Sequence, residues 1–111
     1  MRFDHKVALV SGAGSGIGRA TALGLAAHGA RVAVADLDRA KAEAVVDEIA
    51  AGGGGAVAIA ADAATAHGVE AMIGGVVRAF GGPDILHNNA FGQPALPVGR
   101  SRLAFTADVD E

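Results

Sequence analysis

The sequence predicts an α/β fold in which helices cover both faces of a parallel sheet. Three short apolar runs alternate along the 111 residues with segments of helical periodicity, and a fourth short segment, residues 84–87, is also expected to form a strand. Each apolar run is continuous, which indicates strands that are buried on both faces. Strands that alternate with helices are typically joined by right-handed crossovers into a parallel sheet. The expected order is therefore β-α-β-α-β-α-β, and the chain length suits one domain.

Each of the four runs that we expect to form strands is followed by glycine or by a polar residue. The runs cover residues 6–11, 31–35, 56–61 and 84–87. The first expected helix, over residues 17–28, is rich in alanine and leucine. Gly29 follows it, and glycine is typical of the position just past a helix end.

Two further helices are predicted from apolar residues that recur at helical spacing. In the second helix, over residues 39–51, one face is formed by Ala42, Val45, Val46 and Ile49. In the third helix the periodic residues are Val69, Met72, Ile73, Val76, Val77 and Phe80. Glycines follow both helices, at 52–55 and at 81–82. Residues 91–105 are expected to form a loop, and Thr106 to cap another helix.

The composition excludes several classes of function. A net charge of −3 without a cluster of basic residues argues against a nucleic-acid partner. The chain has no cysteine, which removes disulfides, thiolate zinc sites and cysteine nucleophiles, and its four histidines lack metal-ligand spacing. No segment is apolar for long enough to span a membrane, and no signal peptide begins the chain. We therefore expect a soluble, cytoplasmic protein with no metal site.

A glycine-rich segment lies directly between the first expected strand and the first expected helix. Gly12, Gly16 and Gly18 give the spacing Gly-x-x-x-Gly-x-Gly, which differs from both Gly-x-Gly-x-x-Gly and the P-loop. A helix N-terminus offers unpaired N–H groups and a partial positive charge that favour a pyrophosphate, and glycine lets the ligand approach the backbone. The candidate contacts are Gly12, Ser15, Gly16, Ile17 and Gly18. The alternative is a tight turn that binds nothing.

Asp36 ends the second expected strand, 18 positions after Gly18. An acidic residue about 20 positions after the glycines typically binds the adenosine ribose of a dinucleotide. Its charge would repel the 2′-phosphate of NADP, and Ser15 and Leu37 provide no base to offset this. The sequence therefore favours NAD over NADP. The alternative is a solvated aspartate in a turn.

Further polar residues follow the third and fourth expected strands, at the sheet edge where open α/β sheets bind ligands. Asp62, beside Ala63, is a candidate acceptor for the adenine amino group, and helix capping is its alternative. Asn88 is expected either to contact a ribose or to brace the loop. For Asn89 a structural role between neighbouring strands is equally expected, and Ala90 completes the candidate cofactor contacts.

Residues 11–18, Asp36, Asp62 and Asn88-Asn89-Ala90 together resemble the N-terminal half of the short-chain dehydrogenases/reductases. Ser11 stands where the family has Thr, and Phe91 where it has Gly. The resemblance implies a Rossmann-type doubly wound parallel sheet, here incomplete with strand order 3-2-1-4. It also implies an NAD(P)-dependent oxidoreductase that transfers hydride between nicotinamide and an alcohol or carbonyl carbon. Residues 1–111 would then be the N-terminal part of a single NAD(P)-binding Rossmann domain.

The family's catalytic Asn, Ser, Tyr and Lys would lie beyond residue 111, and the chain contains no tyrosine. The resemblance therefore assigns no catalytic residue here, and these residues alone are expected to be inactive. His87, at the end of the fourth strand, is expected to be packed and hydrogen-bonded and not catalytic.

An incomplete sheet would leave the fourth strand as an apolar edge, and such an edge favours association with another chain. A complete enzyme of this family is expected to be a homo-oligomer. One alternative function is a non-catalytic module for NAD binding or subunit association. Another is a methyltransferase-type Rossmann domain, which is disfavoured because Ser11 stands where such domains have an acidic residue.

Overall fold

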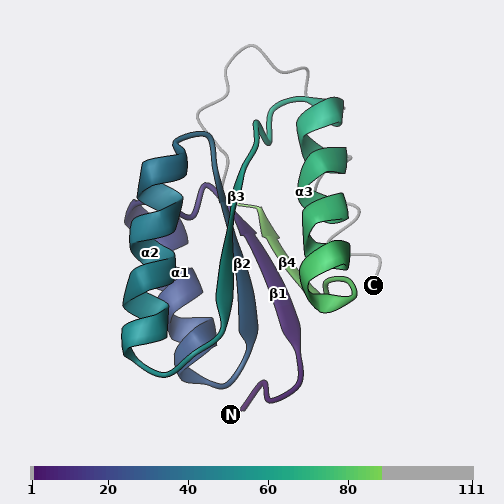
Figure 1. The fold of residues 1–111 in the computed structure, drawn as a ribbon. Coiled ribbons are helices and arrows are strands. Elements are labelled where there is room, and N and C mark those ends of the chain that lie inside the picture. Colours follow the sequence, from purple (N-terminus) through teal and green to yellow (C-terminus); the bar gives the residue numbers. More distant parts are fainter. Residues whose placement is uncertain (1, 89–111) are drawn as a thin grey trace.

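A computed structural model describes residues 2–88, which form the predicted α/β unit (Figure 1). Its strands are β1 (Val7–Ser11), β2 (Arg31–Asp36), β3 (Ala56–Ala60) and β4 (Ile85–Asn88). Its helices are α1 (Gly16–Ala27), α2 (Arg39–Ala51) and α3 (Ala66–Phe80). The order of elements is the predicted one. The expected loop at 91–105 and the expected helix start at Thr106 lie outside the described residues.

The four strands form one parallel sheet in the order β3-β2-β1-β4. This order confirms the prediction of an incomplete Rossmann-type sheet. The chain passes from β3 across the sheet to β4, so the strand order changes direction between β1 and β4. Asp84 fixes the start of β4, because its N–H donates to the Val7 carbonyl over 2.7 Å and its Oδ2 accepts from the Val7 N–H over 2.8 Å.

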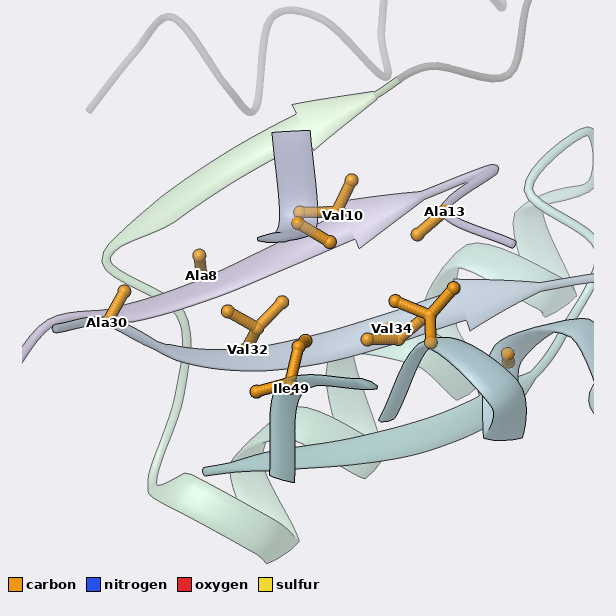
Figure 2. Close-up of a cluster of buried hydrophobic side chains, with 10 residues drawn as sticks. Ala8, Val10, Ala13, Ala30, Val32, Val34 and Ile49 are labelled. Atoms are coloured by element: carbon orange, nitrogen blue, oxygen red, sulfur yellow. The ribbon is translucent and has the colours of Figure 1, made fainter. Parts of the chain in front are cut away.

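Helices cover both faces of the sheet, with α1 and α2 on one face and α3 on the other (Figure 1). Successive strand residues point to opposite faces, so each face has its own apolar core. In the first core, Val10, Val32 and Val34 pack with Ile49 of α2 (Figure 2). In the second, Leu9 of β1 packs with buried residues of α3. The inner strands β1 and β2 are buried on both sides, as their continuous apolar runs predict, whereas β3 and β4 at the two edges are mostly half-buried.

The helices bury the faces that their sequences predict, with one exception. α1 buries two small residues, Gly18 and Ala22, four positions apart. α2 buries Ala42, Val45 and Ile49, as its periodicity predicts. On α3 the prediction is wrong for Val77, which is 50% exposed although it shares the apolar spacing.

Candidate functional site

A cavity of about 360 Å³ lies at the carboxyl ends of β1, β2 and β3. This volume is within the range of about 300–1,000 Å³ that is usual for small-molecule sites. The cavity is bounded by the glycine-rich turn, the N-terminus of α1 and the turns after β2 and β3. Its lining residues are Ser11, Gly12, Ser15, Gly16, Ile17, Ala35, Asp36, Leu37, Ala61, Asp62, Ala63, Ala64 and Met72. Seven of the ten predicted cofactor contacts are thus brought to one cavity.

The glycine-rich turn needs glycine at two positions. Gly12 has φ of 64° and Gly16 has φ of 61°, a backbone conformation that other residues rarely adopt. Between them, Ala13 is buried and its N–H donates to the Ala35 carbonyl over 3.0 Å, which attaches the turn to β2. The turn therefore forms a nearly bare backbone wall beside the cavity.

The N-terminus of α1 differs from those of the two helices that follow. Asp38 caps α2 by accepting from the Lys41 N–H, and Thr65 caps α3 by accepting from the Gly68 N–H. The Ser15 side chain makes no such cap, and the first turn of α1 contains no acidic residue. Gly16 and Ile17 in this turn line the cavity. The partial positive charge of the helix N-terminus is thus available there to an anion.

Asp36 lies opposite the glycine-rich turn and is half-buried, not a solvated turn residue. Its Oδ2 accepts from the Gly14 N–H over 2.9 Å, and its Oδ1 accepts from the Asp38 N–H over 2.9 Å. Each carboxylate oxygen has two acceptor positions. The carboxylate is therefore held by the backbone on two sides and can still accept hydrogen bonds from hydroxyl groups in the cavity.

The turn after β3 brings Asp62 and Ala63 to the cavity. Asp62 Oδ1 accepts from the Ala64 N–H over 2.8 Å, which closes a local turn. Its backbone carbonyl accepts from the Thr65 N–H over 3.2 Å. Thr65 and not Asp62 caps the following helix, so the helix-capping alternative for Asp62 is not what the structure has.

Of the remaining predicted contacts, Gly18 and Asn88 do not line the cavity. Gly18 is buried within α1. Asn88 ends β4, and its Oδ1 accepts from the hydroxyl of buried Ser11 over 2.8 Å. This bond joins β1 and β4 where the strand order changes direction, and the expectation that Asn88 contacts a ribose or braces the loop stays a prediction. Asn89 and Ala90 lie outside the described residues.

His87 differs in part from its prediction. The ring is packed, since Nε2 is buried, but among residues 2–88 this nitrogen has no hydrogen-bond partner. The expectation that His87 is hydrogen-bonded is therefore not met at Nε2. No group of three or more His, Asp or Glu side chains in the same part of the chain is arranged to hold a metal ion. None of its helices combines the length and apolar character that crossing a membrane requires.

Three cavity features were not predicted from the sequence. Met72 of α3 lines the cavity although its spacing indicated only a core residue. Leu37 is 72% exposed at the rim, as is Ile17 at 63%, and no helix or strand pattern singles out Leu37. Gly14 lies in a variable position of the glycine motif, yet it contacts Asp36 directly. Its role is visible only once β2 lies beside the turn.

Comparison with known proteins gives a consistent result over most of the chain. The family model described as short chain dehydrogenase matches residues 6–106. A cyclohexanol dehydrogenase from Acinetobacter sp. (strain SE19) is 46% identical over 80% of this chain and 36% of its own length. A 3-oxoacyl-[acyl-carrier-protein] reductase FabG from Staphylococcus aureus is 54% identical over 77% of this chain and 35% of its own length. The chain thus spans about a third of the length of these two curated relatives.

Solved structures agree with this result. A hydroxysteroid dehydrogenase from Escherichia coli superposes with a TM-score of 0.77 at 39% identity, over 78% of this chain and 37% of that one. A short chain dehydrogenase from Mycobacterium avium has a TM-score of 0.75 at 45% identity, over 78% of this chain and 34% of that one. In both solved structures the matched region is only part of a longer chain.

Proposed function

Since this chain belongs to the short chain dehydrogenase family, we propose that it is the cofactor-binding part of an NAD-dependent oxidoreductase. The proposed reaction is hydride transfer between the nicotinamide of the cofactor and an alcohol or carbonyl carbon. The names of its relatives support an activity of this type, because they include a dehydrogenase of cyclohexanol and a reductase of a 3-oxoacyl group.

The observation that carries the proposal is the arrangement of three features around one cavity. The bare glycine turn lets a pyrophosphate approach the backbone, and the uncapped N-terminus of α1 supplies donors and partial positive charge. Asp36 supplies fixed acceptors on the opposite side. Anion-binding groups and hydroxyl-binding groups that line one cavity suit the pyrophosphate and the adenosine ribose of a dinucleotide.

The choice between NAD and NADP is proposed to depend on Asp36. Its carboxylate would accept from both adenosine ribose hydroxyls and would repel a 2′-phosphate. No arginine or lysine lines the cavity in the part of the chain that the structure describes. One relative, an L-rhamnose 1-dehydrogenase from Azotobacter vinelandii, has NAD(P)(+) in its name. Membership of the family therefore does not fix the choice between NAD and NADP, which must be measured for this chain.

The remaining cavity residues would hold the adenine and the neighbouring groups. Two of the three exposed large apolar side chains among residues 2–88, Ile17 and Leu37, are at this cavity, where they would pack on the cofactor. Asp62 is proposed to accept from the adenine amino group, with Ala63 beside it. We assign Asn88 to holding β4 against β1 through Ser11. Gly18 would act by bringing α1 close to the sheet, and Ala90 stays a proposed contact.

These 111 residues contain no tyrosine, and we assign none of them to proton transfer. Their proposed contribution to the reaction is to bind and orient the cofactor. Without further residues we therefore expect cofactor binding but no turnover of an alcohol or ketone.

The experiment that tests the proposal is calorimetric titration of the protein with NAD and with NADP. NAD is expected to bind at least about tenfold more tightly than NADP, because a carboxylate that accepts from two hydroxyls contributes strongly. Asp36→Ala is expected to weaken NAD binding by about 10-fold to 100-fold and to remove the preference. Asp47→Ala, an exposed carboxylate of α2 that does not line the cavity, is the matched control. No binding of either dinucleotide, or equal binding that Asp36→Ala leaves unchanged, contradicts the proposal.

A further inference from the structure

Gly14 is packed against the side chain that is proposed to select the cofactor. It occupies a variable position of the Gly-x-x-x-Gly-x-Gly spacing, so the motif does not require glycine there. Its φ is not in the left-handed region, so its backbone conformation does not require glycine either. The reason for a glycine at this position must therefore lie in what surrounds it.

The surroundings of Gly14 leave no room for a side chain. A Cβ built on Gly14 would lie 2.8 Å from Oδ2 and 3.0 Å from Cγ of Asp36. On its other side it would lie 2.7 Å from Cβ of Lys41 in the first turn of α2. Cβ atoms in proteins essentially never approach other atoms this closely, and the Lys41 Cβ cannot rotate away because it is bonded directly to the helix backbone. Accommodating a Cβ would force either Asp36 or the start of α2 to move.

The Gly14 N–H also holds Asp36 in place. It donates to Oδ2 over 2.9 Å, while the Asp38 N–H holds Oδ1 over the same distance. The two donors come from opposite sides of the carboxylate, the first from the glycine-rich turn and the second from the approach to α2. Together they fix the plane of the carboxylate group relative to the cavity that Asp36 lines.

From this geometry we propose that Gly14 is a positioning residue for cofactor selection, acting through Asp36. Because Gly14 has no side chain, the glycine-rich turn can lie close to Asp36. The Gly14 N–H can then orient the Asp36 carboxylate toward the ribose hydroxyls. The inference rests on the proposed function, since it concerns how the same cavity distinguishes NAD from NADP.

The test is to measure the dissociation constants of NAD and NADP for Gly14→Ala. NAD affinity is expected to fall by about tenfold, because a displaced carboxylate loses its bonds to the ribose, while NADP affinity changes by less than about threefold. The matched control is Gly24→Ala on α1, where an added Cβ meets nothing within 4 Å; both constants should stay unchanged. An unchanged NAD-to-NADP ratio in Gly14→Ala overturns the inference, whether both affinities fall together or neither falls.

A double-mutant cycle separates positioning from general damage to the turn. If Gly14 acts through Asp36, Gly14→Ala should leave the NAD-to-NADP ratio unaltered in an Asp36→Ala background. The same ratio change in both backgrounds would overturn the inference. Failure of the unmodified protein to bind NAD would instead count against the proposed function, so the two failures are distinguishable.

A second measurement keeps the inference testable if Gly14→Ala does not fold. In Asp36→Asn the weakened bond should speed hydrogen exchange of the Gly14 amide, while the Ala13 amide, bonded to the Ala35 carbonyl, should exchange as before. Equal exchange at Gly14 in both proteins would show that its N–H does not hold the carboxylate, which overturns the inference.

Discussion

Gly68 shows how closely single residues are fitted around the cavity. It is buried in the first turn of α3, and a Cβ built on it would collide with the backbone oxygen of Asp62 and lie 2.9 Å from Oγ1 of Thr65. Glycine here lets the turn that carries Asp62 fold back onto the helix start. The position of a cavity residue thus depends on a glycine that is six residues further along the chain.

Gly68→Ala is expected to destabilise the protein by about 1–3 kcal/mol, the usual cost of overpacking a site that cannot relax freely. Denaturant unfolding followed by circular dichroism would measure this. Gly24→Ala is the control, because glycine is a poor helix former and an exposed helical site should gain about 0.5–1 kcal/mol on substitution. Equal stability of Gly68→Ala and the unmodified protein would show that the Asp62 turn is not held as described.

The sequence predicts the glycines that are needed for their own backbone conformation. It does not predict the glycines that are needed because other residues pack closely against them. Gly12 and Gly16 are needed for their own backbone conformation, which the motif spacing reveals. Gly14 is needed because Asp36 and Lys41 approach it from other parts of the chain, and Gly68 because the turn at Asp62 folds back onto the helix start. No spacing rule contains that information, so the structure is required to find them.

At the scale of elements, α1 and α2 are joined by an ion pair on the protein surface. The Arg19 guanidinium donates to both carboxylate oxygens of Glu48, one of them over 2.9 Å through Nε. This hydrogen bond holds the pKa of Glu48 below its ordinary value. Because the folded-state pKa is lowered, the pair contributes stability above the unfolded pKa, and that contribution is lost as the pH falls through the folded pKa.

Glu48→Gln is therefore expected to melt at a slightly lower temperature than the unmodified protein near neutral pH. The difference should disappear as the pH falls from about 5 to about 2, because the unfolded carboxyl titrates near 4.3. Thermal melts across this range measure it, with Asp47→Asn, an exposed change on the same helix, as control. A difference that stays constant at every pH would contradict a contribution from the ionised pair.

The elements themselves are predictable because their signals are strong and local. Continuous apolar runs identify β1, β2 and β3, and 3.6-residue periodicity identifies the buried faces of α2 and α3. Val77 is the exception to this agreement, because it has the apolar spacing of the buried face but is exposed. Periodicity alone does not show how far the sheet extends beneath α3. The strand order was predicted from family resemblance and not from any pattern within the strands.

At the scale of the whole molecule, the described sheet ends in an edge strand on each side. Among the described residues β4 pairs with β1 alone, and β3 pairs with β2 alone. The curated relatives are about three times longer than the matched region. In the part of the chain that the structure describes, the outer edge of β4 has no partner strand, and an open sheet edge favours pairing with another strand.

The 111-residue chain is accordingly expected to have marginal stability and to associate as its concentration rises. Sedimentation velocity over a range of concentrations, together with thermal melting, measures both properties. A monomer at every concentration with a sharp, reversible melt would contradict this expectation.

The central claim, that the cavity beside α1 binds the dinucleotide, is tested most directly by titrating isotopically labelled protein with NAD and recording the backbone amide resonances. The account predicts the largest shifts at Gly16, Ile17, Leu37 and Ala63, which line the cavity. Gly53, in the turn after α2, and Ala79, near the end of α3, do not line it and should stay unshifted. Shifts centred away from the cavity, or none at millimolar NAD, would contradict the account.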